Sequence, residues 1–407
     1  MDAVLHDLAL HWPLYAAMPF IAALIGYVTK RVAIEMMFRP LDFIGIPPLL
    51  GWQGVVPKHG GRMAAVATEL LTANLLDLKE VFGRIDPVVI TSELEQPLLR
   101  AVDHIAREVL AEHHPRLWEV MPTLAQEMLI KQVQASAPRL VRDFLDDVRE
   151  NLDEVLDVQH MAVQRLTRDK ALLVRLIRET SRPEMAFIAR MGIYFGFGLG
   201  LVQTIVWAFT REPWVLPAFG GVIGLCTDWL AIKLIFVPRE PVRLGRVILQ
   251  GKFQRRRAEV ARQYGELIAT EVLTVQNLLD AVLRGPRADR LAALVERLVS
   301  EAVDAQAAFA KPVVALAVGG PRLRQMKHAA ARKALEQLPD TARYAEGYLT
   351  EAMDVAKMIE QRMLALTPLE FEGLLRPAFR QDEWKLIAVG GVIGFVVGEL
   401  QVLLMLG

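Results

Sequence analysis

The sequence predicts an all-α integral membrane protein, built from a tandem-duplicated unit of span, cytoplasmic helical domain and span. Three observations carry this prediction. A mean hydropathy of +0.29 coexists with 23% charged residues, which indicates that apolar and polar stretches are segregated. Several apolar runs approach the ~20 residues that a membrane-crossing helix needs. Motifs of the first half of the 407-residue chain also return 198 residues later.

Four apolar stretches are expected to form transmembrane helices, at residues 12–38, 191–210, 213–237 and 386–407. The second has no charged residue, and the fourth has only Glu399. The two polar segments between them, 39–190 and 238–385, repeat apolar residues every three or four positions, as in Leu140, Phe144 and Val148. These segments are therefore predicted to form two domains of amphipathic helices, whose apolar faces either pack against one another, as in ordinary bundles, or leave a groove for acyl chains or a partner helix.

Local signals refine this prediction. Asp77 and Thr274 stand at matching places and fit helix N-caps. Pro339 is expected to break a helix in the second polar segment. Cys226, the single cysteine, lies within an apolar run and is expected to be a small buried side chain.

The duplication extends along the whole chain. Residues 26–40 and 224–238 are identical at six of fifteen positions. Six glycines spaced four apart follow the same offset and form stripes typical of close helix packing: Gly192, Gly196 and Gly200, then Gly390, Gly394 and Gly398. Two units with the same orientation predict a pseudo-two-fold axis along the membrane normal.

Charged residues inside the spans recur with their signs exchanged. Lys30 is equivalent to Asp228, and Glu35 is equivalent to Lys233. Equivalent residues lie at equal depth, so two intramembrane charge pairs are expected, because an isolated buried charge is costly. Two other interpretations stay open, namely interfacial side chains that reach toward headgroups and a path for a substrate or ion. Glu399 is the isolated intramembrane carboxylate and a candidate for a role within the bilayer.

Basic residues gather at the ends of both polar segments, and the positive-inside rule places both segments in the cytoplasm and both termini outside. One basic cluster is predicted to bind anionic lipid headgroups, at about 1 kcal/mol per residue. Its members are Arg239, Arg243, Arg246, Lys252, Arg255, Arg256 and Arg257. Determination of topology alone would also account for this cluster.

Composition and motifs argue against several classes of protein. Lysine plus arginine equals aspartate plus glutamate, at 47 each, so nothing suggests a nucleic-acid partner. The sequence has no glycine-rich phosphate loop, no H-E-x-x-H motif and no G-x-S-x-G elbow. We therefore expect no enzyme, no cofactor and no metal site.

The two copies of the charged motif read IGYVTKRVAIEMMFRP and IGLCTDWLAIKLIFVP. With these motifs, the chain resembles the bacterial YheB/YjiN-like membrane proteins, also described as domain of unknown function 445. The family pattern T-x-W-L-A-I-K-x-x-F-x-P is met by Thr227, Trp229–Lys233, Phe236 and Pro238, whereas the first copy departs at Arg31 and Glu35. The resemblance implies a protein of the bacterial cytoplasmic membrane and implies no activity.

Large amphipathic segments beside a small membrane bundle favour a non-enzymatic scaffold or a lipid-handling protein at the inner leaflet. Membrane lipids are the expected partners, and a homo-oligomer or a protein partner is a further option. The alternative is an oligomeric transporter or channel that uses the intramembrane charged residues.

Overall fold

The structure, a computed structural model, describes residues 12–46, 50–236, 240, 242–244, 247–249, 251–307, 320–375 and 383–406. This part of the chain is almost entirely helical, with two short β-hairpins, as the all-α prediction requires. Contacts divide the chain into two compact units. Unit 1 comprises residues 1–71, 166–264 and 359–407, and unit 2 comprises residues 72–165 and 265–358.

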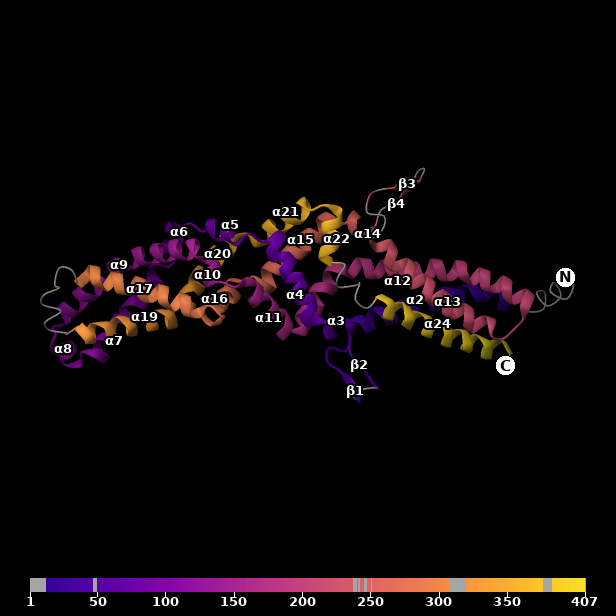
Figure 1. Cartoon of the computed structure of the whole chain (residues 1–407), viewed down its shortest axis with the longest axis horizontal. Helices are drawn as coiled ribbons and strands as arrows, with labels where there is room; N and C mark the ends of the chain where they lie inside the picture. The colour runs from indigo at the N-terminus through magenta and orange to yellow at the C-terminus, as the bar shows by residue number, and fades with distance from the viewer. Residues whose placement is uncertain are drawn as a thin grey trace. The chain divides into compact units, whose positions relative to one another are not determined.

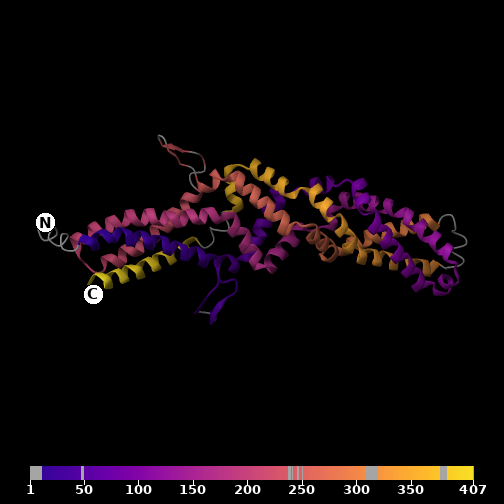
Figure 2. The same cartoon turned by 180° about the vertical axis from the view of Figure 1, so that it is seen from behind.

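Four long helices lie side by side in unit 1 (Figures 1 and 2): α2 (Trp12–Phe38), α12 (Lys170–Thr210), α13 (Val215–Phe236) and α24 (Glu383–Leu406). They coincide with the four predicted spans, although α12 begins 21 residues before the predicted start at 191. Among the described residues, α2 and α12 are long and apolar enough to cross a membrane. Helices α13 and α24 carry shorter apolar stretches, Val215–Leu230 and Ile387–Leu403.

A β-hairpin and short helices follow both α2 and α13, where helices alone were predicted. The first series is β1 (Ile44–Ile46), β2 (Leu50–Trp52), α3 (Val55–Lys58) and α4 (Gly60–Leu70). The second is β3 (Val242–Leu244), β4 (Val247–Leu249), α14 (Lys252–Arg255) and α15 (Arg257–Leu267). Both strand pairs are antiparallel. These strands have three residues each, which is too short for an alternation of apolar and polar residues to predict them.

Unit 2 contains four long helices, α7 (Glu95–His113), α9 (Thr123–Glu150), α17 (Ala288–Ala307) and α19 (Gly320–Ala342). Its shorter helices are η1 (Leu71–Leu75), α5 (Leu78–Gly83), α6 (Pro87–Glu93), α8 (Pro115–Val120), α10 (Leu152–Val155), η2 (Ile268–Val272), α16 (Val275–Arg284), η3 (Arg343–Ala345) and α20 (Glu346–Met353). Helices α11 (Val158–Arg168), α21 (Val355–Ala365) and α22 (Pro368–Leu375) complete the chain.

The apolar faces of the two polar segments are buried against one another. Val155 of the first segment forms one core cluster with Leu291, Val295 and Ala331 of the second, and Phe144 packs onto this cluster. The segments 39–190 and 238–385, expected as separate domains, thus contribute together to unit 2. Their remaining residues belong to unit 1 with the apolar helices.

The local signals have mixed outcomes. Asp77 accepts a hydrogen bond from the backbone N–H of Glu80, and Thr274 accepts one from Asn277, which confirms both N-caps. Pro339 lies inside α19, so the helix break predicted there is wrong. Cys226 is exposed, because the turn of α13 directs the neighbouring residues 227 and 228 inward instead.

Candidate functional site

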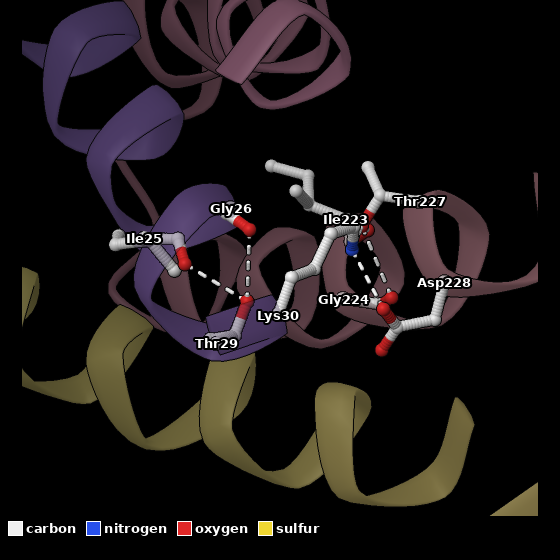
Figure 3. A network of polar contacts seen from close by, with 8 residues as sticks. All are labelled: Ile25, Gly26, Thr29, Lys30, Ile223, Gly224, Thr227 and Asp228. Carbon is white, nitrogen blue, oxygen red and sulfur yellow. Dashed lines mark hydrogen bonds and ion pairs between the residues drawn. The ribbon is translucent and has the colours of Figure 1, made fainter. Parts of the chain in front are cut away.

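A buried polar centre lies between α2 and α13 (Figure 3). Lys30 Nζ is 2.7 Å from Asp228 Oδ1 and donates a hydrogen bond to Thr227 Oγ1 at 2.8 Å. Thr227 in turn donates to the carbonyl oxygen of Ile223, so its hydroxyl serves as both donor and acceptor. The side chains of Lys30 and Asp228 are 0% and 7% exposed. The structure thus brings together the first predicted charge pair and seals it among the helices.

Two of the predicted packing glycines make room for this pair. A Cβ atom on Gly192 would lie 2.9 Å from Lys30 Cδ. One on Gly390 would overlap Oδ2 of Asp228. The sequence suggested only backbone packing for these glycines, although both stand in the helices that flank the charged motifs. Their absent side chains therefore allow a lysine and an aspartate to meet inside the bundle.

The remaining glycines bring helix backbones together. A Cβ atom on Gly196 would lie 2.6 Å from the carbonyl oxygen of Ala22, and one on Gly398 would lie 2.5 Å from Pro217 Cα. Gly200 and Gly394 make equally close approaches to α2 and α13. These contacts join α2 to α12 and α13 to α24, as expected for stripes of small residues.

A second buried polar pair joins the ends of α12 and α24. Gln203 Nε2 donates to Gln401 Oε1 at 3.1 Å, and both side chains are buried. Like Lys30 and Asp228, these residues stand 198 positions apart. Polar contacts therefore link residues 198 positions apart at two levels of unit 1.

The second predicted charge pair is not formed among the described residues. Glu35 lies 2.9 Å from Arg178 and 3.2 Å from Arg39. Lys233 is exposed and stands over the ring of Trp229, with Nζ 4.6 Å from the ring centroid. A cationic partner from α12 reaches Glu35, so the expected contact with Lys233 is replaced.

Glu399 is exposed on α24. It is the only charged residue in the sequence of residues 386–407. Its side chain does not line the interior of the bundle. The neighbouring Gly398 is buried against α13, which shows how the helix turns Glu399 outward.

The predicted basic cluster is only partly available to headgroups. Arg255 is exposed. Arg256 lies 2.6 Å from buried Glu184, and hydrogen bonds to Glu259 and Glu184 hold the pKa of Arg256 above its ordinary value. Arg257 donates to the carbonyl oxygens of Met363, Leu364 and Leu366 and so caps the end of α21. Arg239 and Arg246, with the side chains of Arg243 and Lys252, lie outside the described residues.

Unit 2 contains a partly open apolar cavity of about 170 Å³ between α7, α9, α17 and α19. Its lining side chains are almost all aliphatic or aromatic: Leu98, Ala101, Val102, Ile105, Ala137, Leu140, Val141, Phe144, Val295, Leu298, Val299, Ala334, Leu335 and Leu338, with Gln337 and Thr341. The cavity is built from residues of both polar segments. Neither segment alone could form the cavity. A prediction that considers each segment by itself therefore cannot identify it.

Polar side chains bridge the helices that line this cavity. Lys333 of α19 lies 3.0 Å from Glu108 and 3.8 Å from Glu112, both on α7. The hydrogen bond from Lys333 lowers the pKa of Glu108. Arg100 stacks over the ring of Tyr344, with 5.7 Å between its Cζ and the ring centroid. These contacts join α19 and η3 to α7.

Comparison with known proteins finds relatives over nearly the whole chain. The chain is 22% identical to a UPF0754 membrane protein of Synechococcus sp. (strain JA-2-3B'a(2-13)), across 97% of this chain and 99% of that protein. It is 20% identical to UPF0754 membrane protein Npun_R4433 of Nostoc punctiforme, across 96% and 97%. No family model matches the chain. No solved structure matches it.

The family name expected from the motifs, YheB/YjiN-like, does not occur among these relatives, so that finer assignment is not confirmed. The relatives are named as membrane proteins, and α2 and α12 have the length and hydropathy of membrane-crossing helices. Together, these observations support membrane association and a relationship to an uncharacterised family of membrane proteins.

Proposed function

We propose that this chain is a non-enzymatic lipid-handling protein of the bacterial inner membrane, which holds the apolar end of a lipid in unit 2. The apolar cavity between α7, α9, α17 and α19 carries this proposal. An apolar cavity of about 150 Å³ is large enough to bind benzene, so this partly open cavity of about 170 Å³ has room for a short hydrocarbon segment. The end of an acyl chain has this chemistry.

The arrangement of the chain in the membrane forms part of the proposal. All four apolar helices of unit 1 cross the bilayer, both polar segments are cytoplasmic and both termini lie outside. The two halves arose by duplication and are related by a two-fold axis along the membrane normal. Equivalent residues that touch each other must lie close to such an axis, and Lys30–Asp228 and Gln203–Gln401 are two contacts of this kind.

The succession of elements gives further support for duplication. Strand β1 covers residues 44–46 and β3 covers 242–244, again 198 positions apart. Each half also has a five-residue π-helical segment after its short helices, at Leu71–Leu75 and Ile268–Val272. Single π-turns are uncommon, so their recurrence at matching places favours a common origin.

Photochemical labelling of the full chain in nanodiscs tests lipid handling. A fatty acid that carries a diazirine near its terminal methyl group is added, irradiated and mapped by peptide mass spectrometry. We expect labels on the cavity-lining parts of α7, α9, α17 and α19. Lipid-facing residues of the unit 1 helices provide an internal reference, because the probe in the bilayer labels them in any case.

A matched pair of variants on α7 sharpens the test. Ala101 lines the cavity, whereas Ala111 is exposed on the same helix. Ala101→Phe should fill the cavity and reduce labelling of unit 2, and Ala111→Phe should leave it unchanged. Labels confined to unit 1 in the wild-type chain would contradict lipid handling and favour a scaffold. Equal labelling of unit 2 in both variants would also contradict it.

One observation favours the transport alternative. Among the described residues, Asp228 Oδ2 is buried without a hydrogen-bond partner, an arrangement suited to an exchangeable proton. A transporter of this kind would show ion flux in proteoliposomes that Asp228→Asn abolishes while the protein stays folded. The close packing of Gly192 and Gly390 around the pair is the reason we favour lipid handling over transport.

A further inference from the structure

The β1–β2 hairpin is held rigidly at its base. Gly54 N–H donates to the carbonyl oxygen of Pro40 at 2.9 Å, and Gln53 Nε2 donates to that of Leu41 at 2.8 Å. Trp52 Nε1 reaches back to the carbonyl oxygen of Met36, at 3.2 Å, in the last turns of α2. One of these hydrogen bonds thus joins the hairpin to α2, and the other two join it to the residues that follow α2.

One face of this hairpin is apolar and exposed. Ile44 and Ile46 stand two positions apart, so they point to the same side of β1, and they are 67% and 73% exposed. On the opposite face Gly45 pairs with Gly51, and the ring of Phe43 covers the space that a Cβ atom on Gly51 would need. Gly45 has a φ of 142°, which side chains other than glycine rarely allow.

The composition of the hairpin and the direction in which it projects also favour contact with lipid. Residues 43–52 include no charged residue. Charged groups gather just before them, where Asp42 lies 2.8 Å from Lys170, and Arg39 lies beside Glu35. Within unit 1 the hairpin projects sideways from the axis of α2 (Figures 1 and 2). A helix that crosses the bilayer would therefore direct this hairpin along the membrane surface rather than away from it.

We propose that the β1–β2 hairpin is an interfacial anchor, whose Ile44 and Ile46 lie at the boundary between headgroups and acyl chains of the inner leaflet. Apolar side chains beside a charged layer are typical of such surface-bound segments, and tryptophan is enriched at the same depth. The charged groups at the base would stand at headgroup level. This inference rests on the proposed placement of α2 in the bilayer.

A second copy of the chain is a less suitable occupant of this face. Strand addition requires an edge long enough for several backbone hydrogen bonds, and β1 and β2 have three residues each. On the glycine face, neither Gly45 nor Gly51 has a side chain to interlock with a partner strand. A lipid surface needs neither feature.

Spin-label accessibility in liposomes tests the anchor. The full chain with Cys226→Ser receives one cysteine at a time, by Ile44→Cys, Ile46→Cys, Leu24→Cys or Val120→Cys, each at an exposed position. Oxygen gathers in the bilayer, whereas a charged nickel chelate stays in water. Leu24 on α2 provides the bilayer reference, and Val120 in unit 2 provides the aqueous reference.

We expect labels at positions 44 and 46 to show higher accessibility to oxygen than to the chelate, as at position 24. Water-like values at 44 and 46, with bilayer-like values at 24, would overturn the anchor and leave the topology intact. Water-like values at position 24 would overturn the placement of α2 and the anchor with it. Dipolar broadening between copies at position 44, lost on dilution with unlabelled protein, would overturn the anchor in favour of a second copy.

Discussion

The Lys30–Asp228 pair allows a demanding test of the symmetry of unit 1. Lys30→Asp would place two carboxylates where a 2.7 Å ion pair now lies, with side chains 0% and 7% exposed. Removal of one partner from a buried pair typically costs about 3–5 kcal/mol, because the other charge remains buried without compensation. Domains are stable by about 5–15 kcal/mol, so this loss would remove a large part of the total.

The double variant Lys30→Asp with Asp228→Lys should recover most of that loss. Thr29 donates to the carbonyl oxygen of Ile25 as Thr227 donates to that of Ile223, so a lysine at position 228 would find an equivalent hydroxyl. Gly390 would flank its stem as Gly192 flanks Lys30. Unfolding by sodium dodecyl sulfate, followed by circular dichroism, gives the free energies.

The exposed pair Lys170–Asp42 has nearly the same length, 2.8 Å, and provides the control. Lys170→Asp should change the unfolding free energy by only about 0–1 kcal/mol, because water screens both partners. If the double variant at positions 30 and 228 is as unstable as Lys30→Asp alone, the proposed two-fold equivalence is refuted.

Two further predictions concern packing and pH. Gly390→Ala should destabilise the protein by about 1–3 kcal/mol, because its Cβ would meet the Asp228 carboxylate. Gly198→Ala, whose Cβ would meet none of the described residues within 4 Å, should be neutral or slightly stabilising in the same unfolding assay. The lowered pKa of Glu108 means that its pair with Lys333 contributes stability above the ordinary pKa of 4.5 and loses it as the pH falls further. The protection of α7 and α19 against hydrogen exchange, corrected for the intrinsic exchange rate at each pH, should fall in acid for the wild type, and Glu108→Gln should remove that dependence. Equal acid sensitivity in both would contradict it.

Equivalence between the two motifs predicted two charge pairs, of which the structure forms Lys30–Asp228 and not Glu35–Lys233. Lys30 and Asp228 occupy matching places in two similar motifs, so the proposed axis brings them together. Glu35 contacts Arg178 because of the rotation of α12 against α2, and no sequence motif predicts that rotation. The outward direction of Glu399 and Cys226 depends on helix rotation in the same way.

Two other features were beyond the reach of local patterns. Three-residue strands give too short an alternation to separate a hairpin from a loop, so Ile44–Ile46 carried no strand signal. The cavity needs α7 and α9 beside α17 and α19, although the two helix pairs are far apart in the chain. Helical periodicity predicted apolar faces, and only the fold shows that they leave a space between them.

Native mass spectrometry of the full chain, released from nanodiscs under mild conditions, tests lipid handling most directly. The proposal predicts a single acyl-bearing lipid that stays bound after the loosely held bilayer lipids are stripped. This lipid should be lost in Ala101→Phe and retained in Ala111→Phe. A wild-type chain that keeps no lipid, or keeps the same lipid in both variants, would contradict a lipid-binding cavity in unit 2.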